Sequence, residues 1–268
     1  MDWKDQTGSG PEGYEEFLVP AMFAPFAERL VVRAGVGEGS RVLDVACGTG
    51  IVSRAAARRV GVGGSVTGVD LGEPTLAVAR SRASEDGVAI EYIQSDAGAL
   101  PFEDGAFDVV LCQQGLQFFP DRGGALTEMR RVLKPGGRLG VATWAAIERT
   151  PFMALANALG RHVGSDAAQM MHAPYALHEG ADLGRLISDA GFAEVRTFEE
   201  TILCTWESHS RFAQRAAGAT PIAALLEGVS DDARRALAEE VASELAPRAV
   251  AGDRLRATMT TNVALASA

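Results

Sequence analysis

Three aspartates end three successive hydrophobic segments in the first hundred residues, and a glycine-rich turn accompanies the first of them. Asp44 opens "DVACGTG", Asp70 ends "SVTGVD", and Asp96 follows "AIEYIQS". Gly48 and Gly50 leave the backbone open to a ligand, because no Cβ atom stands in the way. The pattern predicts a nucleotide-type ligand held by carboxylates, and a tight strand-to-helix turn with no ligand is the simpler alternative.

The positions of the other two acids suggest what each would bind. Asp70 lies 20 residues after Gly50 and is placed to accept two hydrogen bonds from a ribose diol. Asp96 is placed to accept from the exocyclic amine of an adenine, with the Ala97 amide facing a ring nitrogen. A solvated aspartate at a strand end is the alternative for each acid taken singly. Three acids at successive strand ends beside a glycine turn favour the ligand.

An NAD(P)-dependent oxidoreductase shares part of this pattern, because it also has a glycine-rich first turn and an acid about 20 residues later. Two features speak against it. Ser53 stands where the third glycine of G-x-G-x-x-G would be. Asp44 would repel a pyrophosphate, since like charges disfavour each other. Asp44 favours a ligand that carries positive charge, and S-adenosylmethionine has an ammonium, a sulfonium and no phosphate.

The elements that must position these residues alternate between strand and helix over the first 145 residues. Their composition and periodicity predict strands at 40–46, 65–70, 89–96, 107–114 and 138–144, and helices at 51–60, 75–87 and 121–134. Such alternation predicts a parallel sheet with helices on both faces. Right-handed crossovers then place the carboxyl ends of the strands along one edge, where such sheets bind ligands.

The stretch 40–145 resembles a class I S-adenosylmethionine-dependent methyltransferase, of the small-molecule group that includes ubiquinone/menaquinone-type enzymes. The matching segments are "VLDVACGTG", "VTGVD", "SDAGALPFEDGAFDVVLCQQGLQFFPD" and "EMRRVLKPGGRLGVATW". The resemblance implies an α/β fold with a Rossmann-like seven-stranded sheet, parallel with an antiparallel C-terminal hairpin, and helical lid insertions. It also implies methyl transfer from S-adenosylmethionine, with S-adenosylhomocysteine as the product.

The resemblance further implies which residues hold this cofactor. The turn after the first strand would cradle the methionine part through Asp44, Ala46, Gly48, Thr49 and Gly50. Asp70 and Leu71 would hold the ribose, and Asp96 and Ala97 the adenine. Gln113 would line the cofactor cleft.

We expect one methyltransferase domain over residues 1–268. It would comprise an N-terminal lid helix (1–34), a cofactor-binding core (35–145), two lid or acceptor-binding insertions (146–180 and 207–252), and the C-terminal part of the sheet (181–206 and 253–268). Within that last part, a helix is expected at 181–192 and strands at 193–206 and 256–268. Lids exclude water and carry specificity. The alternative is that the inserted helices only thicken the fold.

The acceptor site is predicted from polar and aromatic residues beside the cofactor core, namely Gln114, Gln117, Phe118, Tyr175 and Trp206. A pocket of this kind would be mostly apolar and suited to a ring system or a lipid-like acceptor. Aromatic residues at helical spacing, however, belong to the core more often than to a pocket. His172 and His178 in "MHAPYALHE" are candidate bases for a hydroxyl or carbon acceptor, with surface histidines as the alternative.

Composition and charge argue against several classes of partner. The net charge of −10, and the lack of an Asn/Asp-Pro-Pro-aromatic motif after the fourth strand, make nucleic acid unsuitable as a partner. The basic clusters Arg54/Arg58/Arg59 and Arg130/Arg131/Lys134 are interpreted as solvated helix faces. The three cysteines show no metal-binding spacing, so no metal site is expected. A small-molecule acceptor and a monomer or homodimer are therefore expected.

The sequence also predicts where the protein is located. No apolar run approaches the ~20 residues that a membrane span needs. The polar, acidic start of the chain lacks the features of a signal peptide, which predicts a cytoplasmic protein. A non-catalytic S-adenosylmethionine-binding protein that kept the fold is a further alternative.

Overall fold

The computed structural model describes residues 10–82, 89–220, 222–226, 228–250 and 253–268. Its sheet has the order β3-β2-β1-β4-β5-β8-β6, with the short β7 paired to β8 off this path. The strands are β1 (Arg41–Val45), β2 (Ser65–Asp70), β3 (Ile90–Gln94), β4 (Phe107–Gln113), β5 (Leu133–Trp144), β6 (Ala193–Trp206), β7 (Ala249–Val250) and β8 (Arg254–Ser267). The first five pair in parallel, and β8 runs antiparallel to β5 and β6. All seven predicted strands are present, and β7 is an addition that was not predicted.

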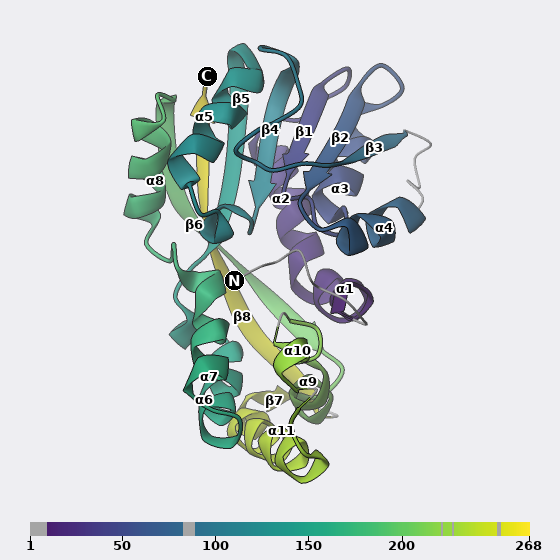
Figure 1. Cartoon of the computed structure of the whole chain (residues 1–268), viewed down its shortest axis with the longest axis vertical. Coiled ribbons are helices and arrows are strands. Elements are labelled where there is room, and N and C mark those ends of the chain that lie inside the picture. Colours follow the sequence, from purple (N-terminus) through teal and green to yellow (C-terminus); the bar gives the residue numbers. More distant parts are fainter. Residues whose placement is uncertain (1–9, 83–88, 221, 227, 251–252) are drawn as a thin grey trace.

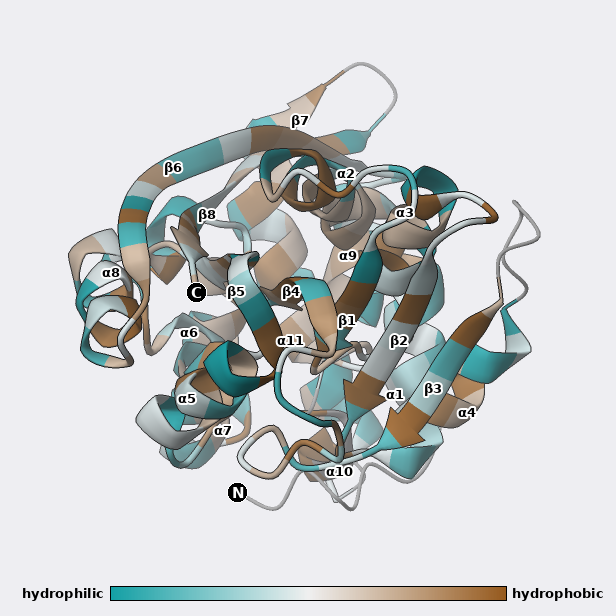
Figure 2. Ribbon diagram, turned by 90° about the horizontal axis from the view of Figure 1, so that it is seen from above, coloured by the Kyte–Doolittle hydropathy of each residue, from teal (hydrophilic) through white to brown (hydrophobic). Residues whose placement is uncertain are grey.

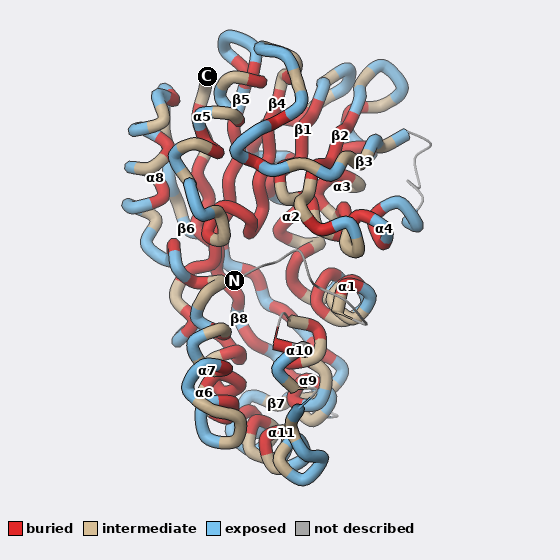
Figure 3. Tube along the Cα trace, in the orientation of Figure 1, coloured by how far each residue is buried: buried red, intermediate tan, exposed pale blue. Residues whose placement is uncertain are grey.

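Helices cover both faces of the sheet, as predicted (Figures 1 and 2). One face carries α2 (Ala24–Arg33) and α3 (Ile51–Val60), and the other carries α5 (Arg122–Val132) and α8 (Gly180–Asp189). The helix α4 (Glu73–Ser81) runs beside β2 and β3. Alternate residues of β1 pack into the two layers, Val42 with α2 and α3, and Leu43 with α5. Figure 3 shows the central strands buried, which explains their continuous apolar sequence.

Several predicted boundaries differ from the structure. The helix predicted at 75–87 begins at Glu73, because Pro74 fits the first turn of a helix, and it ends at Ser81. Residues 83–88 of that prediction lie outside the described residues. The fifth strand begins at Leu133, not at residue 138, because Leu133 pairs with Phe107 before the register shifts. The preceding helix therefore ends at Val132.

The N-terminal helix predicted within 1–34 is interrupted by a π-helix, and residues 1–9 lie outside the described residues. The helix α1 (Gly10–Gly13) leads into η2, a π-helix over Tyr14–Phe23, which continues into α2. The Ala24 amide donates to the Val19 carbonyl oxygen, five residues back. This wide turn changes which side chains share a face, so the usual helical spacing fails over residues 14–23.

Both predicted insertions fold into helices that we call the helical lobe. Residues 146–180 contain η4 (Ile147–Arg149), α6 (Phe152–His162), α7 (Ser165–His172) and η5 (Ala173–Tyr175). Residues 207–250 contain α9 (His209–Arg215), α10 (Ala223–Leu226), α11 (Asp231–Leu245), η6 (Ala246–Arg248) and β7. The lobe surrounds the stretch where β6 and β8 continue past the end of β5, in the lower half of Figure 1.

The helical lobe has an apolar core that also includes the N-terminal helices. Phe212 of α9 packs against Phe152 of α6 and Trp206 of β6, with ring centroids 5.3 and 5.1 Å away. Phe23 of η2 and Phe26 of α2 both contact the Trp144 ring at the end of β5. Burial of these rings joins the lobe, the N-terminal helices and the sheet through one hydrophobic cluster.

Candidate active site

The carboxyl ends of β1 and β4 touch at the edge of the sheet that holds the predicted cofactor residues. Ala46 follows β1 with a φ of 56°, and Gln114 follows β4 with a φ of 58°. A left-handed backbone is costly for residues with a Cβ atom and is concentrated at functional sites. A Cβ built on Gly115 would lie 2.6 Å from the Ala46 Cβ, so this glycine permits the approach. The residues after β4 therefore border the turn after β1.

Asp44 is a buried carboxylate with only one of its two oxygens satisfied. The Ser53 hydroxyl donates to its Oδ2 at 2.6 Å, while Oδ1 has no hydrogen-bond partner. Burial raises the pKa of Asp44 to about 7, partly opposed by the Ser53 hydrogen bonds. Ser53, which breaks the dinucleotide-binding pattern, thus orients this acid. A buried oxygen without a partner is expensive and indicates a position for a ligand donor.

Asp70 joins the turns that follow β1 and β2. Its Oδ2 accepts from the Gly48 amide and its Oδ1 from the Gly72 amide, each at 2.9 Å. Burial raises its pKa above the ordinary value. Leu71 follows in the chain, and its carbonyl oxygen accepts from the Gln94 side chain at 2.9 Å. The two amides fix the direction of the Asp70 carboxylate.

Gly48 leaves open space in the turn after β1, beside Asp44 and Asp70. Its φ is 56°, and a Cβ built on it would meet no atom within 4 Å. Gly50 differs, because a Cβ there would lie 2.2 Å from the Tyr92 hydroxyl oxygen. The free Asp44 oxygen and the open side of Gly48 fit a ligand with an ammonium group. Among the described residues, no group of three or more His, Cys, Asp or Glu side chains is arranged to hold a metal ion.

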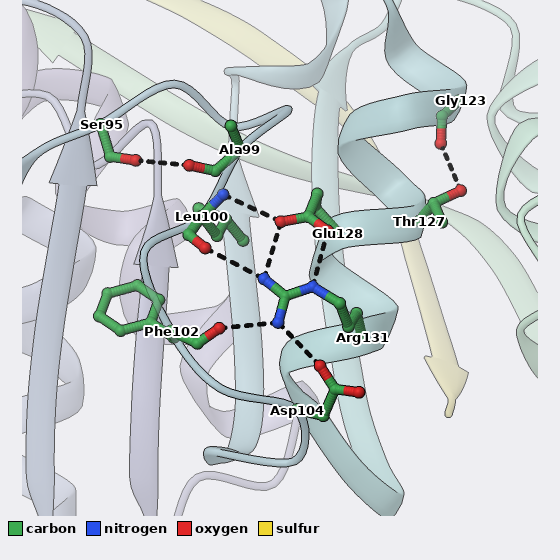
Figure 4. A network of polar contacts seen from close by, with 9 residues as sticks. All are labelled: Ser95, Ala99, Leu100, Phe102, Asp104, Gly123, Thr127, Glu128 and Arg131. Atoms are coloured by element: carbon green, nitrogen blue, oxygen red, sulfur yellow. Dashed lines mark hydrogen bonds and ion pairs between the residues drawn. The ribbon is translucent and has the colours of Figure 1, made fainter.

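The loop after β3 carries Asp96 and Ala97 and is held by Arg131 of α5 (Figure 4). Arg131 donates to the carbonyl oxygens of Phe102 at 2.7 Å and Leu100 at 3.0 Å. It also donates twice to Glu128, whose carboxylate accepts from the Leu100 amide. Asp96 is exposed and Ala97 is buried. The interpretation of Arg131 as part of a solvated helix face is therefore wrong, because its guanidinium holds this loop.

Sequence reasoning missed a contact between the N-terminal segment and the cofactor turn. Glu15 of η2 accepts from the Thr49 hydroxyl at 2.5 Å and from Arg54 of α3 at 2.7 Å. Arg54 also donates to the Thr49 carbonyl oxygen at 2.6 Å, so its interpretation as a solvated residue is wrong. Tyr14 lies beside these groups, and burial together with the charges of Glu15, Asp70 and Asp44 raises its pKa. Nothing in the acidic start of the chain distinguishes Glu15 from its acidic neighbours.

The three glutamines predicted for the cofactor cleft and acceptor site are buried at the end of β4. Gln113 donates to the Phe23 carbonyl oxygen at 3.1 Å. Gln117 donates to the Gln114 side chain at 3.3 Å, and Gln114 donates to the Thr261 hydroxyl at 3.0 Å. Phe118 ends the short helix η3 (Leu116–Phe118), which lies beside η5. The structure therefore places all three glutamines in one segment, at the end of β4 and in η3.

Tyr175 and Trp206, both predicted for the acceptor site, lie in different parts of the structure. Tyr175 ends η5, next to η3, and its buried hydroxyl has a raised pKa because of desolvation. Trp206 ends β6 within the apolar core of the helical lobe, where its ring packs against Phe212. Its indole nitrogen is buried and has no hydrogen-bond partner.

The two candidate bases lie on either side of Tyr175. His172 ends α7 and is exposed. The His178 ring is about half exposed, and its Nδ1 lies 3.0 Å from the Tyr175 carbonyl oxygen. Because a carbonyl oxygen only accepts, Nδ1 carries the proton in this contact. The main chain of His178 is fixed by the Asn262 side chain, which donates to its carbonyl oxygen at 2.7 Å.

Comparisons with known proteins identify the family. A family model described as a methyltransferase domain matches residues 43–141. A ubiquinone/menaquinone biosynthesis C-methyltransferase of Chromobacterium violaceum is 36% identical over 172 residues, which cover 60% of this chain and 70% of that protein. The chain belongs to the class I S-adenosylmethionine-dependent methyltransferases. The resemblance inferred from the sequence is confirmed, and the methyltransferase interpretation is favoured over the oxidoreductase one.

Other relatives align with this methyltransferase over shorter stretches. An uncharacterized protein of Mycobacterium tuberculosis is 42% identical over 47% of this chain and 45% of its own length. The chain thus spans about half the length of several curated relatives that it matches. Phosphoethanolamine N-methyltransferase 2 of Haemonchus contortus has the same fold, with a TM-score of 0.64 and 21% identity, covering 100% of this chain and 60% of that one.

None of the described helices is both long and apolar enough to cross a membrane.

Proposed function

We propose that this methyltransferase moves the methyl group of S-adenosylmethionine to a small acceptor that is apolar or contains a ring. The observation that carries the proposal is the buried, half-satisfied carboxylate of Asp44 beside the open turn at Gly48. S-adenosylmethionine, when bound, supplies a methyl group that is already activated by its sulfonium. The task of the chain is therefore to bind, to orient and to exclude water.

Each group of the site has a role in this proposal. Asp44 would accept from the ammonium, and the turn at Ala46, Gly48, Thr49 and Gly50 would hold the methionine part. Asp70 and Leu71 would bind the ribose, Asp96 and Ala97 the adenine, and Gln113 would line the cleft. The free oxygen of Asp44 is what makes it suited to a cationic group, because such a partner satisfies the buried acceptor and its charge together.

The acceptor would lie between the end of β4 and the helical lobe, with η2 and the lobe acting as a lid. The apolar cluster around Trp144 borders this region and would favour a ring-containing or lipid-like molecule. Gln114, Gln117, Phe118 and Tyr175 would contact the acceptor. Trp206 would act from within the lobe core, by shaping the apolar wall.

His172 and His178 are the proposed bases for an acceptor that must lose a proton. The held main chain and fixed tautomer of His178 leave Nε2 as the nitrogen that can take a proton. An amine acceptor arriving deprotonated would need neither residue. Alanine variants of each histidine separate these cases, because only a base changes the pH dependence of kcat.

The decisive experiment uses S-adenosylmethionine with a deuterated methyl group. The protein is incubated with it and with a small-molecule extract, and mass spectrometry is used to find labelled products. Asp70→Asn should abolish the labelled product, whereas Asp182→Asn on the exposed face of α8 should not. Cofactor binding without a labelled product in any extract would support a non-catalytic binding protein, and absence of cofactor binding would refute the proposal.

A further inference from the structure

A hydrogen-bonded relay at the sheet edge fixes the direction in which Gln117 points its amide. The Thr261 hydroxyl lies 2.8 Å from the Thr143 carbonyl oxygen and 3.4 Å from the Asn262 carbonyl oxygen. Carbonyl oxygens only accept, so the single Thr261 hydroxyl proton is used there. The Thr261 oxygen must then accept from the amide nitrogen of Gln114, at 3.0 Å. The Gln114 oxygen is left to accept from Gln117, at 3.3 Å.

The relay leaves the Gln117 carbonyl oxygen without a donor. This oxygen is buried and has no hydrogen-bond partner, and the whole residue is only 3% exposed. Flipping the Gln117 amide would place its oxygen against the Gln114 oxygen, two acceptors with no proton between them, so the relay opposes the flip. Arg122 holds the segment in place by donating to the Gln117 main-chain oxygen at 2.9 Å.

Gln113 shows the same arrangement through a different contact. Its amide nitrogen donates to the Phe23 carbonyl oxygen, which can only accept, and its own oxygen is buried without a partner. Gln113 and Gln117 thus lie close together in sequence, and each has a buried amide oxygen without a partner. This is unusual in a folded protein, where buried acceptors are nearly always paired. In both residues the group without a partner is an amide oxygen, which accepts. A ligand bound beside them would therefore have to donate a hydrogen bond.

The relay also lies next to the cofactor turn. Gly115, between the two free glutamine oxygens in sequence, packs against Ala46. The main-chain amide of Gln114 donates to the Ala142 oxygen at 2.8 Å, which ties the left-handed residue to β5. The strained turn is thus rigidly held where β1 and β4 end.

We propose that the relay Thr261–Gln114–Gln117 makes this site specific for acceptor molecules that carry an N–H or O–H group, which donates to the Gln117 oxygen. The inference rests on the proposed function and names the class of its acceptor. Gln117 is a binding residue in this account, while Gln114 and Thr261 are positioning residues. A glutamine oxygen cannot take a proton at neutral pH, so its effect is on binding and orientation.

The test measures binding, so that it does not depend on turnover. The protein is saturated with S-adenosylhomocysteine, and the dissociation constants of naphthol, naphthylamine, naphthalenethiol and methylnaphthalene, all substituted at the same ring position, are measured by calorimetry. The hydroxyl and amine compounds should bind at least about tenfold more tightly than methylnaphthalene, the size expected for one neutral hydrogen bond. The thiol, a weak donor, should bind like methylnaphthalene.

Matched variants connect this preference to the relay. Thr261→Val removes the hydroxyl at constant shape and Gln117→Met removes the oxygen, so each should reduce the preference to less than about threefold. Thr261→Ser keeps the hydroxyl and should keep the preference, as should Gln214→Met on the exposed side of α9. Thermal unfolding and the affinity for S-adenosylhomocysteine report whether each variant is folded.

Three results would overturn the inference: equal affinity of the wild-type protein for naphthol and methylnaphthalene, no binding of any of the four compounds, or an unchanged preference in both Gln117→Met and Thr261→Val. Loss of S-adenosylhomocysteine binding by the wild-type protein would instead count against the proposed function. Intact binding of that product without a donor preference would count against the relay alone.

Discussion

The hydroxyl of Thr49 donates a hydrogen bond of 2.5 Å to the carboxylate of Glu15, although 34 positions separate the two residues. The same carboxylate accepts from Arg54 at 2.7 Å. Thr49 belongs to the glycine turn after β1, and Glu15 belongs to the π-helix of the N-terminal segment. The contact therefore ties a segment far away in sequence to the turn that is proposed to hold the cofactor.

The first prediction follows from this contact. Glu15→Ala leaves the partly buried Arg54 without its acid and should lower the free energy of unfolding by about 2–3 kcal/mol. It should also release the N-terminal segment, so that S-adenosylmethionine dissociates faster in stopped-flow experiments. The neighbouring Glu16→Ala is the control, because Glu16 is exposed and pairs with Arg215 only at 3.6 Å. Equal effects of the two substitutions would show that Glu15 has no special role.

The second prediction concerns the pH dependence of stability. Burial raises the pKa of Asp44 from 3.8 to about 7, so the folded protein retains a proton that the unfolded chain has lost between these values. Without cofactor, the contribution of Asp44 to stability should therefore fall as the pH rises from about 4 to about 7, and stay constant above that. Asp44→Asn should remove this dependence, and chemical denaturation at a series of pH values measures it.

The size and sign of the effect make the Asp44 test specific. The variant and the wild-type protein should unfold alike near pH 4, and the variant should be more stable by up to about 4 kcal/mol above pH 7. The same substitution should abolish S-adenosylmethionine binding, because the free carboxylate oxygen is lost. In the wild-type protein, binding at pH 6 should release protons, as calorimetry in two buffers would detect. A constant stability difference across this pH range would refute the assignment.

The regular elements were predictable because local patterns determine them. The helix at Ile51–Val60 and the strands Ser65–Asp70 and Ala193–Trp206 have the predicted bounds. In each case buried apolar residues are bounded by glycine, polar or aspartate residues that end the element. The parallel pairing of the first five strands also follows from the alternation of strands and helices.

Tertiary contacts explain what the sequence did not reveal. Glu15 and Arg54 look like ordinary surface charges until the π-helix brings them together, and π-helical spacing has no pattern that is readable in sequence. The start of β5 at Leu133 depends on its pairing with Phe107 across a register shift. The direction of the Gln117 amide depends on a hydroxyl 144 residues away in sequence, in β8, and no local pattern encodes it.

The third prediction compares two glycines with left-handed backbone and open space around the missing Cβ. Gly48 lies in the cofactor turn, and Gly136 lies within β5 close to its start, with φ values of 56° and 74°. Alanine at either position should lower the free energy of unfolding by about 1–2 kcal/mol, because of the backbone conformation alone. Only Gly48→Ala should weaken S-adenosylmethionine binding, by at least about tenfold, since its methyl group occupies the proposed ligand space. Similar cofactor affinities in the two variants would argue against this position for the ligand.

The last prediction concerns Arg131, whose guanidinium donates to Glu128, Asp104 and two carbonyl oxygens of the loop after β3 (Figure 4). Lysine keeps the charge but cannot make this planar set of bonds, so Arg131→Lys should release the loop that carries Asp96 and Ala97. We expect hydrogen exchange of the loop amides to accelerate and the dissociation constant of S-adenosylmethionine to rise about tenfold, corresponding to about 1.4 kcal/mol. Arg130→Lys, at the exposed neighbouring position on α5, should change neither quantity. If the loop amides of Arg131→Lys exchange at the wild-type rate, the loop is held by other contacts, and the adenine site does not depend on this arginine.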